Sequence, residues 1–221
     1  IKSMLKIKSL MKEFLPQVVV GTGGYASALP LYIASKNNSP LPIVLQEQNS
    51  IPGMTTRWFS ERAKSICIAF DEANEALEEN TILTGNPVRQ GIADGNRDNG
   101  IKEFKLKKDH QTIFLFGGSQ GSAYLNKMLN KVVDNIAGAG LQVLWQTGDS
   151  DYNKYKHRDS KNIRVVPFIH NMADAYAMAD LIISRSGALT LAEITVCGKP
   201  SILVPFPSAA ADHQTKNAQS L

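Results

Sequence analysis

The sequence has few of the features that mark secreted, membrane-spanning or metal-binding proteins. Its 221 residues include only two cysteines, Cys67 and Cys197, which lie far apart in apolar segments. That pattern argues against a disulfide framework or a cysteine-based metal site, and it favours free, buried thiols in a reducing cytoplasm. No apolar run approaches the roughly 20 residues of a membrane-spanning helix. The basic N-terminus is not followed by an apolar segment of the signal-peptide kind.

The chain is also poor in aromatic residues and in net charge. Aromatic residues make up 7% of the sequence and the formal net charge is +4. That charge is too small to indicate a nucleic-acid partner, and no aromatic stacking platform is present. The four histidines are scattered and have no neighbouring Ser or Cys that would suggest a nucleophile pair. We therefore expect no nucleic-acid partner, no metal and no cofactor. The apolar content of 43% is enough for a substantial core.

Short apolar segments alternate with helical patterns along the whole chain. This alternation predicts an α/β fold with parallel strands and right-handed crossovers. Each half contains a unit of strand, glycine-rich loop and helix, and the polar segment 91–110 separates the halves. We expect two Rossmann-like domains facing each other across a cleft, with residues 1–90 in the first, a linker over 91–110, and residues 111–221 in the second. The predicted strands are 17–20, 42–46, 66–70 and 82–84, then 112–116, 142–146, 163–168, 181–183 and 201–204.

Both ends of the chain fall inside helical patterns. The sequence begins at Ile1 and stops at Leu221, so we expect it to be a piece of a longer protein. The helical pattern over residues 1–15 is amphipathic and rich in lysine. Such a helix packs on its own domain with its lysines in water, or lies on an anionic membrane surface. The sequence leaves both alternatives open.

Residues 181–193 are a candidate binding element. An apolar strand is followed by a turn over 184–187 and by a helix that begins at Ala188. Open α/β sheets bind ligands at the carboxyl ends of their strands, and a helix N-terminus suits a phosphate. Glu193 lies on the same helix and could accept hydrogen bonds from a diol such as ribose. The alternative is a simple turn with an ordinary surface glutamate.

Two glycine-rich loops and one acidic pair are further candidates. Residues 21–24 and 117–121 each follow a strand, without the spacing of a dinucleotide or Walker loop. The second loop can still offer backbone N–H groups and the Ser119 hydroxyl to a diphosphate. Asp149 and Asp151 have a spacing that holds a divalent ion in some sugar transferases. Because they open a helical pattern, we interpret them as helix-capping residues.

Six motifs occur in the order and spacing of one known family. They are residues 20–25 (VGTGGY), 47–49 (EQN), 85–89 (GNPVR), 117–121 (GGSQG), 185–193 (RSGALTLAE) and 213–218 (HQTKNA). Together they resemble the MurG family of peptidoglycan glycosyltransferases, in glycosyltransferase family 28. The resemblance implies a GT-B fold and inverting, metal-independent transfer of N-acetylglucosamine (GlcNAc) from UDP-GlcNAc to the muramoyl 4-hydroxyl of undecaprenyl-diphospho-muramoyl-pentapeptide. It also implies a peripheral protein on the cytoplasmic face of the bacterial inner membrane.

The resemblance assigns residues to both substrate sites. The donor diphosphate would lie on Ser119 and the helix start at 188–190, the ribose on Glu193, and the uracil edge on the backbone of Ile169. Further donor contacts would come from the linker, the first domain and the last helix. The implied donor residues are Asn49, Arg89, Ser119, Ile169, Ala188, Leu189, Thr190, Glu193 and Gln214, and the implied acceptor residues are Tyr25 and Glu47.

Two departures limit what the resemblance implies about catalysis. Many family members carry His immediately before the Glu-Gln-Asn motif, where this chain has Gln46, which cannot take up a proton at neutral pH. The family's proposed general base would precede Ile1, so we expect the 221-residue chain alone to be inactive in transfer.

Two alternatives to the transferase function remain. One is another two-domain UDP-sugar enzyme, such as a glycolipid transferase or a 2-epimerase. The other is a non-catalytic nucleotide-sugar-binding subunit.

Overall fold

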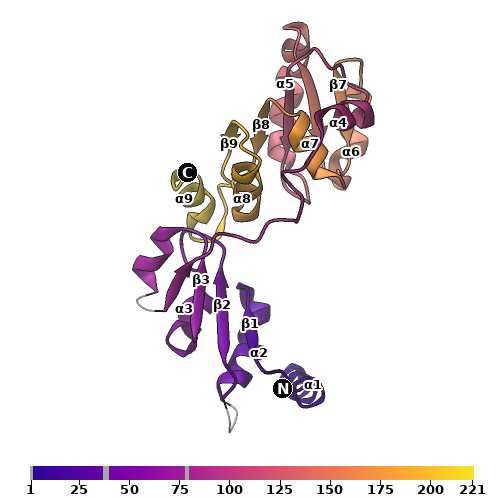
Figure 1. Ribbon diagram of the computed structural model, residues 1–221. Helices are drawn as coiled ribbons and strands as arrows, with labels where there is room; N and C mark the ends of the chain where they lie inside the picture. Colours follow the sequence, from indigo (N-terminus) through magenta and orange to yellow (C-terminus); the bar gives the residue numbers. More distant parts are fainter. Residues whose placement is uncertain (1, 37–39, 78–79) are drawn as a thin grey trace. The chain divides into compact units, whose positions relative to one another are not determined.

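The computed structural model of the chain describes residues 2–36, 40–77 and 80–221. The chain forms two compact units (Figure 1). The first consists of residues 1–86 together with 210–221, and the second of residues 87–209. Each unit contains one sheet of parallel strands, so the predicted alternation of strands and helices is confirmed.

The first unit is built on a four-stranded parallel sheet in the order β1-β2-β3-β4. Its buried core is apolar and includes Leu31, Ile43, Leu45 and Ile66. The strands are β1 (Val19–Gly21), β2 (Ile43–Glu47), β3 (Ser65–Ile68) and β4 (Thr81–Leu83). The helices are α1 (Lys2–Phe14), α2 (Gly24–Ser35), α3 (Met54–Phe59) and α9 (His213–Gln219), with 3₁₀ helices η1 (Ser60–Arg62), η2 (Asp71–Ala76) and η4 (Ala210–Asp212).

The second unit has a five-stranded parallel sheet in the order β7-β6-β5-β8-β9. The chain builds the sheet from β5 outward to β7, then returns to add β8 on the other side of β5, so the strand order reverses between β5 and β8. The strands are β5 (Thr112–Phe116), β6 (Gln142–Gln146), β7 (Ile163–Val166), β8 (Leu181–Ser184) and β9 (Ser201–Leu203). The helices are α4 (Arg97–Phe104), α5 (Ala123–Gly138), α6 (Asp149–Tyr155), α7 (Met172–Met178) and α8 (Ala188–Val196), with η3 (Lys156–Arg158).

Alternating side chains of the second sheet supply two separate cores. Phe114 and Phe116 of β5 belong to a core shared with α4, α7 and α8. Leu115 between them belongs to a core that also contains Trp145 of β6 and residues of α5. Successive side chains of a strand point to opposite faces, so the all-apolar β5 has both faces covered, as parallel sheets require.

The segment expected to be a linker is a folded part of the second unit. Residues 91–110 contain α4, which packs against α7. Arg97 at the start of α4 donates to both carboxylate oxygens of Asp180 at 3.1 Å and to the carbonyl oxygen of Met178 at 2.6 Å. The polar composition that suggested a linker thus reflects a polar helix held by charged contacts.

Local chemistry sets where several elements begin and end. The acidic segment from Asp71 forms a 3₁₀ helix ending at Ala76, and residues 78–79 lie outside the described residues. Helix α5 begins at Ala123 because Ser122 is its N-cap and accepts from the N–H of Leu125. Cys67 and Cys197 are free, as expected, but half-buried rather than buried. Within the described ranges, we find no helix with the length and hydrophobicity needed to cross a membrane.

Candidate functional site

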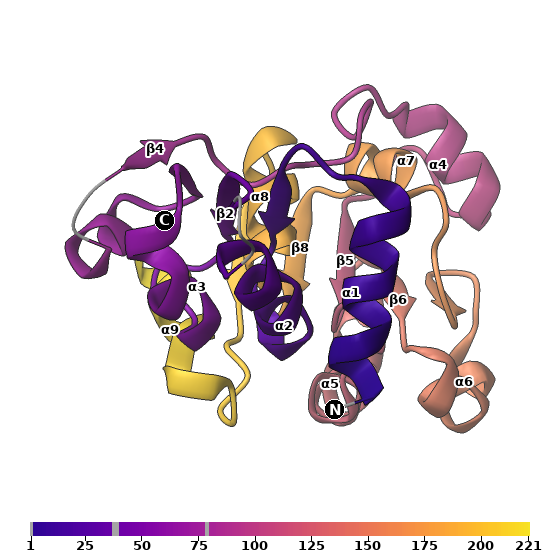
Figure 2. The ribbon, with the colours of Figure 1, turned by 90° about the horizontal axis from the view of Figure 1, so that it is seen from below.

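The carboxyl ends of β5 and β8 lie side by side in the second unit (Figure 2). Their last residues, Phe116 and Ser184, are register partners, so the loop 117–121 and the turn 185–187 begin at the same edge of the sheet. This is the point at which the strand order reverses, where doubly wound sheets bind their ligands. The structure therefore brings the glycine loop and the start of α8 together, as the sequence suggested.

The glycine-rich loop 117–121, called the glycine loop from here on, requires glycine for two separate reasons. Gly118 and Gly121 have φ values of +90° and +76°, which favour glycine. A Cβ at Gly121 would also collide with the carbonyl oxygen of Thr147, because this loop packs directly on the loop after β6. Ser119, the expected phosphate ligand, is exposed on the same loop.

The first turn of α8 lies at the same edge. Gly187 is its N-cap and makes no side-chain capping bond, so the first backbone N–H groups of α8 are not capped by that residue. Of the three expected diphosphate residues, Ala188 is buried, Leu189 is 44% exposed and Thr190 is half-buried. The geometry suits an anion bound by main-chain N–H groups more than one bound by these side chains.

Arg185 fastens the turn before α8. Its guanidinium donates to the carbonyl oxygens of Val204 and Pro205 at 3.1 and 2.7 Å and to the Ser122 hydroxyl at 3.0 Å. The side chain is buried, and that burial lowers the pKa of Arg185 below its ordinary value. Arg185 thus joins the start of α8 to the start of α5 and to the loop after β9, so its function here is structural.

Gln146 connects the glycine loop with the segment that follows β7. Its Nε2 donates to the carbonyl oxygen of Gly118 at 3.1 Å, and its Oε1 accepts from the backbone N–H of Ile169 at 2.9 Å. Gln146 is 2% exposed. The backbone N–H of Ile169 is therefore already engaged. A nucleobase could still bind the carbonyl oxygen of Ile169 without breaking this bond.

Glu193 projects from α8 into a buried polar contact. Its Oε2 accepts from the Tyr176 hydroxyl at 3.0 Å, and its Oε1 forms an ion pair with Nε of Arg89 at 3.2 Å. The side chain of Glu193 is 12% exposed and that of Arg89 is 57% exposed. Glu193 is thus no ordinary surface residue, and two expected donor residues, Arg89 and Glu193, contact one another.

The other four expected substrate residues belong to the first unit, and Glu47 is one of them. The Glu47 carboxylate is buried, and it accepts from the N–H groups of Asn49 and Gly53 at 3.0 and 2.9 Å and from the Thr56 hydroxyl at 2.6 Å. It therefore holds the loop between β2 and α3, and both of its oxygens are already engaged. Tyr25, in contrast, is 74% exposed at the start of α2.

Asn49 and the last helix are joined within the first unit. Oδ1 of Asn49 accepts from Nδ2 of Asn217 at 3.1 Å, and Asn217 is fully buried. Gln214, the other expected donor residue of α9, is half-buried three positions earlier. These contacts explain why residues 210–221 belong to the first unit. The expected boundaries had placed them in the second.

Gln46, which stands where many family members have His, holds the chain before the second unit. Its Nε2 donates to Oδ1 of Asn86 at 2.9 Å, and Nδ2 of Asn86 donates to the carbonyl oxygen of Gln48 at 2.9 Å. Among the described residues, Oε1 of Gln46 has no hydrogen-bond partner although it is buried. The amide of Gln46 cannot itself take up a proton at neutral pH.

The acidic pair opens α6 but does not cap it. Asp149 is the first residue of the helix, the N-cap is Gly148, and Gly148 makes no side-chain capping bond. Asp151 accepts from Nδ2 of Asn126 at 2.9 Å. Two carboxylates in a first turn are stabilised by the helix dipole. Across the described part of the chain, no three His, Cys, Asp or Glu residues are arranged to hold a metal ion.

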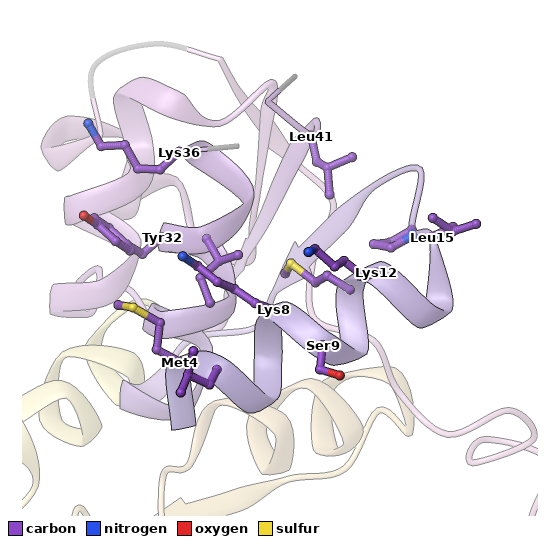
Figure 3. Close-up of a pocket in the computed structure, with 12 residues that line it drawn as sticks. Met4, Lys8, Ser9, Lys12, Leu15, Tyr32, Lys36 and Leu41 are labelled. Carbon is purple, nitrogen blue, oxygen red and sulfur yellow. The ribbon is translucent and has the colours of Figure 1, made fainter. Parts of the chain in front are cut away.

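A separate hollow of about 900 Å³ lies between α1 and α2 of the first unit (Figure 3). Lys8 and Lys12 of α1 and Lys36, directly after α2, line it, and its walls are otherwise mostly apolar. None of the residues of α1 is buried. The lining residues are Met4, Leu5, Lys8, Ser9, Met11, Lys12, Leu15, Pro16, Tyr32, Ile33, Lys36 and Leu41.

The second unit is a doubly wound sheet with a glycine-rich loop and a helix N-terminus at its switch point. The first unit of the chain also contains a parallel sheet. This combination is characteristic of GT-B glycosyltransferases. The comparisons agree with this class. The model of the glycosyltransferase family 28 N-terminal domain matches residues 1–68, and that of the family's C-terminal domain matches residues 112–221. The chain belongs to glycosyltransferase family 28.

Curated relatives extend over the whole chain. It is 40% identical over 225 residues to a UDP-N-acetylglucosamine--N-acetylmuramyl-(pentapeptide) pyrophosphoryl-undecaprenol N-acetylglucosamine transferase of Flavobacterium psychrophilum, covering 100% of this chain and 61% of the relative. A protein of the same name from Cytophaga hutchinsonii is 42% identical over 224 residues, covering 100% and 60%. The chain thus spans about 60% of the length of these relatives.

Solved structures agree on the fold. Acinetobacter baumannii MurG superposes with a TM-score of 0.73 at 29% identity, covering 99% of this chain and 60% of that one. The UDP-GlcNAc 2-epimerase of Methanocaldococcus jannaschii superposes with a TM-score of 0.63 at 13% identity, covering 98% and 72%. The second likeness shows a shared fold alone, and the expected GT-B fold is confirmed.

Sequence reasoning assigned no role to three residues that organise the site. Tyr176, Gln146 and Arg185 are all buried and all make polar contacts. Tyr176 lies in an apolar helix and Gln146 ends an apolar strand, so each has the pattern of a core position. Polar side chains at the ends of buried elements were the available signal, because a buried polar group needs a partner.

Proposed function

We propose that the protein transfers GlcNAc from UDP-GlcNAc to the 4-hydroxyl of a lipid-linked muramyl pentapeptide. The observation that carries the proposal is that the loop 117–121 and the start of α8 begin at the same edge of the sheet, with Glu193 on the same helix. Relatives that match the entire chain bear the name of this transferase. The likeness to epimerases is far lower in sequence identity, so we favour the transferase over that alternative.

In this proposal the second unit binds the UDP moiety. The loop 117–121 and the first turn of α8 direct main-chain N–H groups toward one edge of the sheet, where they suit a diphosphate. Glu193 accepts hydrogen bonds from the ribose hydroxyls, and the carbonyl oxygen of Ile169 accepts from the uracil N3–H. Ser119 and Arg89 add contacts to the donor.

The first unit contributes the remaining contacts in this proposal. Asn49 and Gln214 approach the donor, and the exposed ring of Tyr25 faces the acceptor. We do not assign Glu47 to the acceptor, because its carboxylate is buried and already accepts several hydrogen bonds.

The proposed reaction is a single in-line displacement that inverts the anomeric carbon and requires no metal ion or other cofactor. Charge develops on the departing UDP, and preoriented N–H groups at a helix N-terminus stabilise such charge. The contact of Asp151 with Asn126 supports a structural function for the acidic pair.

We further propose that the protein acts at the cytoplasmic face of the inner membrane, as a peripheral protein. The observation in favour is the hollow between α1 and α2, where three lysines surround mostly apolar walls. Basic side chains beside apolar surface suit the headgroup region of an anionic bilayer.

Calorimetric titration of the 221-residue chain with UDP tests the donor site. Glu193→Ala should weaken UDP binding by about ten- to a hundredfold, because hydrogen bonds to a charged acceptor contribute about 1.5–3 kcal/mol. The loss should nearly vanish with 2′,3′-dideoxy-UDP, which lacks both hydroxyls. Equal losses for the two ligands would remove Glu193 from the ribose site. The sugar product distinguishes the enzymes: a 2-epimerase would convert UDP-GlcNAc without any acceptor.

A further inference from the structure

Tyr176 is a buried polar residue at the centre of an aromatic cluster. Its ring lies edge-on to Phe114 and Phe116, with ring centroids 6.1 Å away in each case. Both phenylalanines belong to β5, the strand that leads into the glycine loop. The only described contact of the Tyr176 hydroxyl is with Oε2 of Glu193, at 3.0 Å. The position of the hydroxyl is therefore set by the same strand that positions the glycine loop.

The hydroxyl of Tyr176 is a permanent donor. Burial, and then the negative charge of Glu193, raise the pKa of Tyr176 far above its ordinary value. The hydroxyl is therefore protonated, and able to donate, across the neutral pH range. A phenol that always donates fixes one oxygen of the carboxylate and leaves the other free to accept from a different group.

The two partners of Glu193 differ in how readily they can be replaced. Tyr176 is fully buried and cannot move away without disrupting the core. Arg89 holds Oε1 from a side chain that is 57% exposed. Exposed ion pairs contribute little to stability, so a ligand hydroxyl can displace the guanidinium at small cost.

We propose that Tyr176 is a positioning residue for ribose recognition: it holds Oε2 of Glu193 so that Oε1 faces the diol, where the ribose takes the place of Arg89. The inference rests on the proposed UDP site. A merely structural Tyr176 would satisfy its own buried hydroxyl, and its loss would weaken all ligands alike. A positioning residue affects only the ligands that have the hydroxyls.

The test compares UDP with 2′,3′-dideoxy-UDP by calorimetry on four versions of the 221-residue chain. Tyr176→Phe removes one oxygen atom, and Tyr155→Phe is the matched control, because Tyr155 is equally buried in the other core of the same unit. Arg89→Ala removes the exposed partner. Circular dichroism and thermal unfolding establish that each variant is folded.

We expect Tyr176→Phe to weaken UDP binding by about three- to tenfold and dideoxy-UDP binding by less than about twofold. Tyr155→Phe should leave both affinities within about twofold. Arg89→Ala, which carries the test if Tyr176→Phe is unstable, should keep or increase the preference for UDP over dideoxy-UDP, because only the ribose hydroxyls have to displace the guanidinium.

Two results would overturn the inference while the proposed function stands. One is a UDP-to-dideoxy-UDP ratio in Tyr176→Phe that equals the parent ratio. The other is an Arg89→Ala variant that loses this discrimination, which would make Arg89 the residue that orients Glu193. If the folded parent chain does not bind UDP at all, the donor site itself is wrong.

Discussion

Oδ1 of Asn217 accepts two hydrogen bonds from Ser50, one from the backbone N–H at 2.9 Å and one from the hydroxyl at 3.1 Å. Both residues are buried. The contact joins α9, near the C-terminus, to the loop that follows β2 in the first unit. It is the reason that the last twelve residues, 210–221, fold with the beginning of the chain, although the family's C-terminal domain model includes them.

Asn217→Ala should destabilise the first unit. The change leaves the N–H of Ser50 buried without an acceptor, which costs about 1–3 kcal/mol. Hydrogen exchange should show loss of protection at Ser50 and along α9, with the second unit unaffected. Gln219→Ala, on the exposed side of the same helix, is the control. Unchanged protection at Ser50 in Asn217→Ala would contradict the assignment of α9 to this unit.

Gln146→Leu should affect both stability and UDP binding. It leaves the N–H of Ile169 without its acceptor and disconnects that segment from the glycine loop. We expect a loss of about 1–3 kcal/mol in unfolding free energy and a clear increase in the Kd for UDP.

Gln142→Leu is a matched control for this prediction. Gln142 is equally buried at the opposite end of β6, where it bonds the backbone of Lys107 and the Thr112 hydroxyl. It should lose similar stability and keep its UDP affinity. Equal effects of both changes on UDP binding would show that Gln146 acts through stability alone.

In the complete enzyme, Asp149→Ala and Asp151→Ala should not change how the transfer rate depends on added Mg²⁺ or Mn²⁺. Asp151 contacts Asn126, and both carboxylates lie in the first turn of α6. Their loss should reduce stability modestly, by about 0.3–1 kcal/mol per helix-start charge. Rate measurements across a metal titration check this. Loss of activity that Mn²⁺ restores would instead identify a metal site.

Replacement of Lys2, Lys6, Lys8 and Lys12 by Gln should weaken binding to anionic vesicles by about tenfold or more at low salt. All four lysines are exposed on α1, and attraction to an anionic surface is screened by salt. Sedimentation with vesicles measures the effect. The control replaces an equal number of exposed lysines of the second unit, Lys102, Lys127, Lys131 and Lys161. Identical losses in both variants would show that the effect comes from net charge and not from α1.

Unfolding free energy should fall as the pH rises above about 8.5. Burial raises the pKa of Cys197, and burial raises the pKa of Tyr176 still further. Both groups hold their protons more tightly when folded. The contribution of Cys197 is complete below the ordinary thiol pKa of about 8.5 and is lost as the pH rises above it, whereas that of Tyr176 is lost only above the ordinary phenol pKa of about 10. Urea unfolding between pH 7 and 10 measures the Cys197 slope. Cys197→Ala should flatten it and Tyr176→Phe should leave it almost unchanged below pH 10, and a Cys197→Ala curve parallel to the parent would contradict the shift of the Cys197 pKa.

The sequence by itself determined the alternation of strands and helices and the location of the glycine loop. These are local features: apolar runs such as 112–116 are the length of buried strands, and glycines punctuate their ends. The start of α8 at Ala188 followed from the same local rules. The order and spacing of the six motifs also identified the family before any contact was known.

Only the tertiary structure decided the partners of the polar residues. Glu193 contacts Tyr176 and Arg89, Glu47 is turned inward to its own loop, and Asn217 joins α9 to the first unit. Spacing along the chain cannot predict such pairs, because they join segments that are close only after the sheets have formed. A buried polar group must find a partner, but which partner it finds is set by packing of the whole unit.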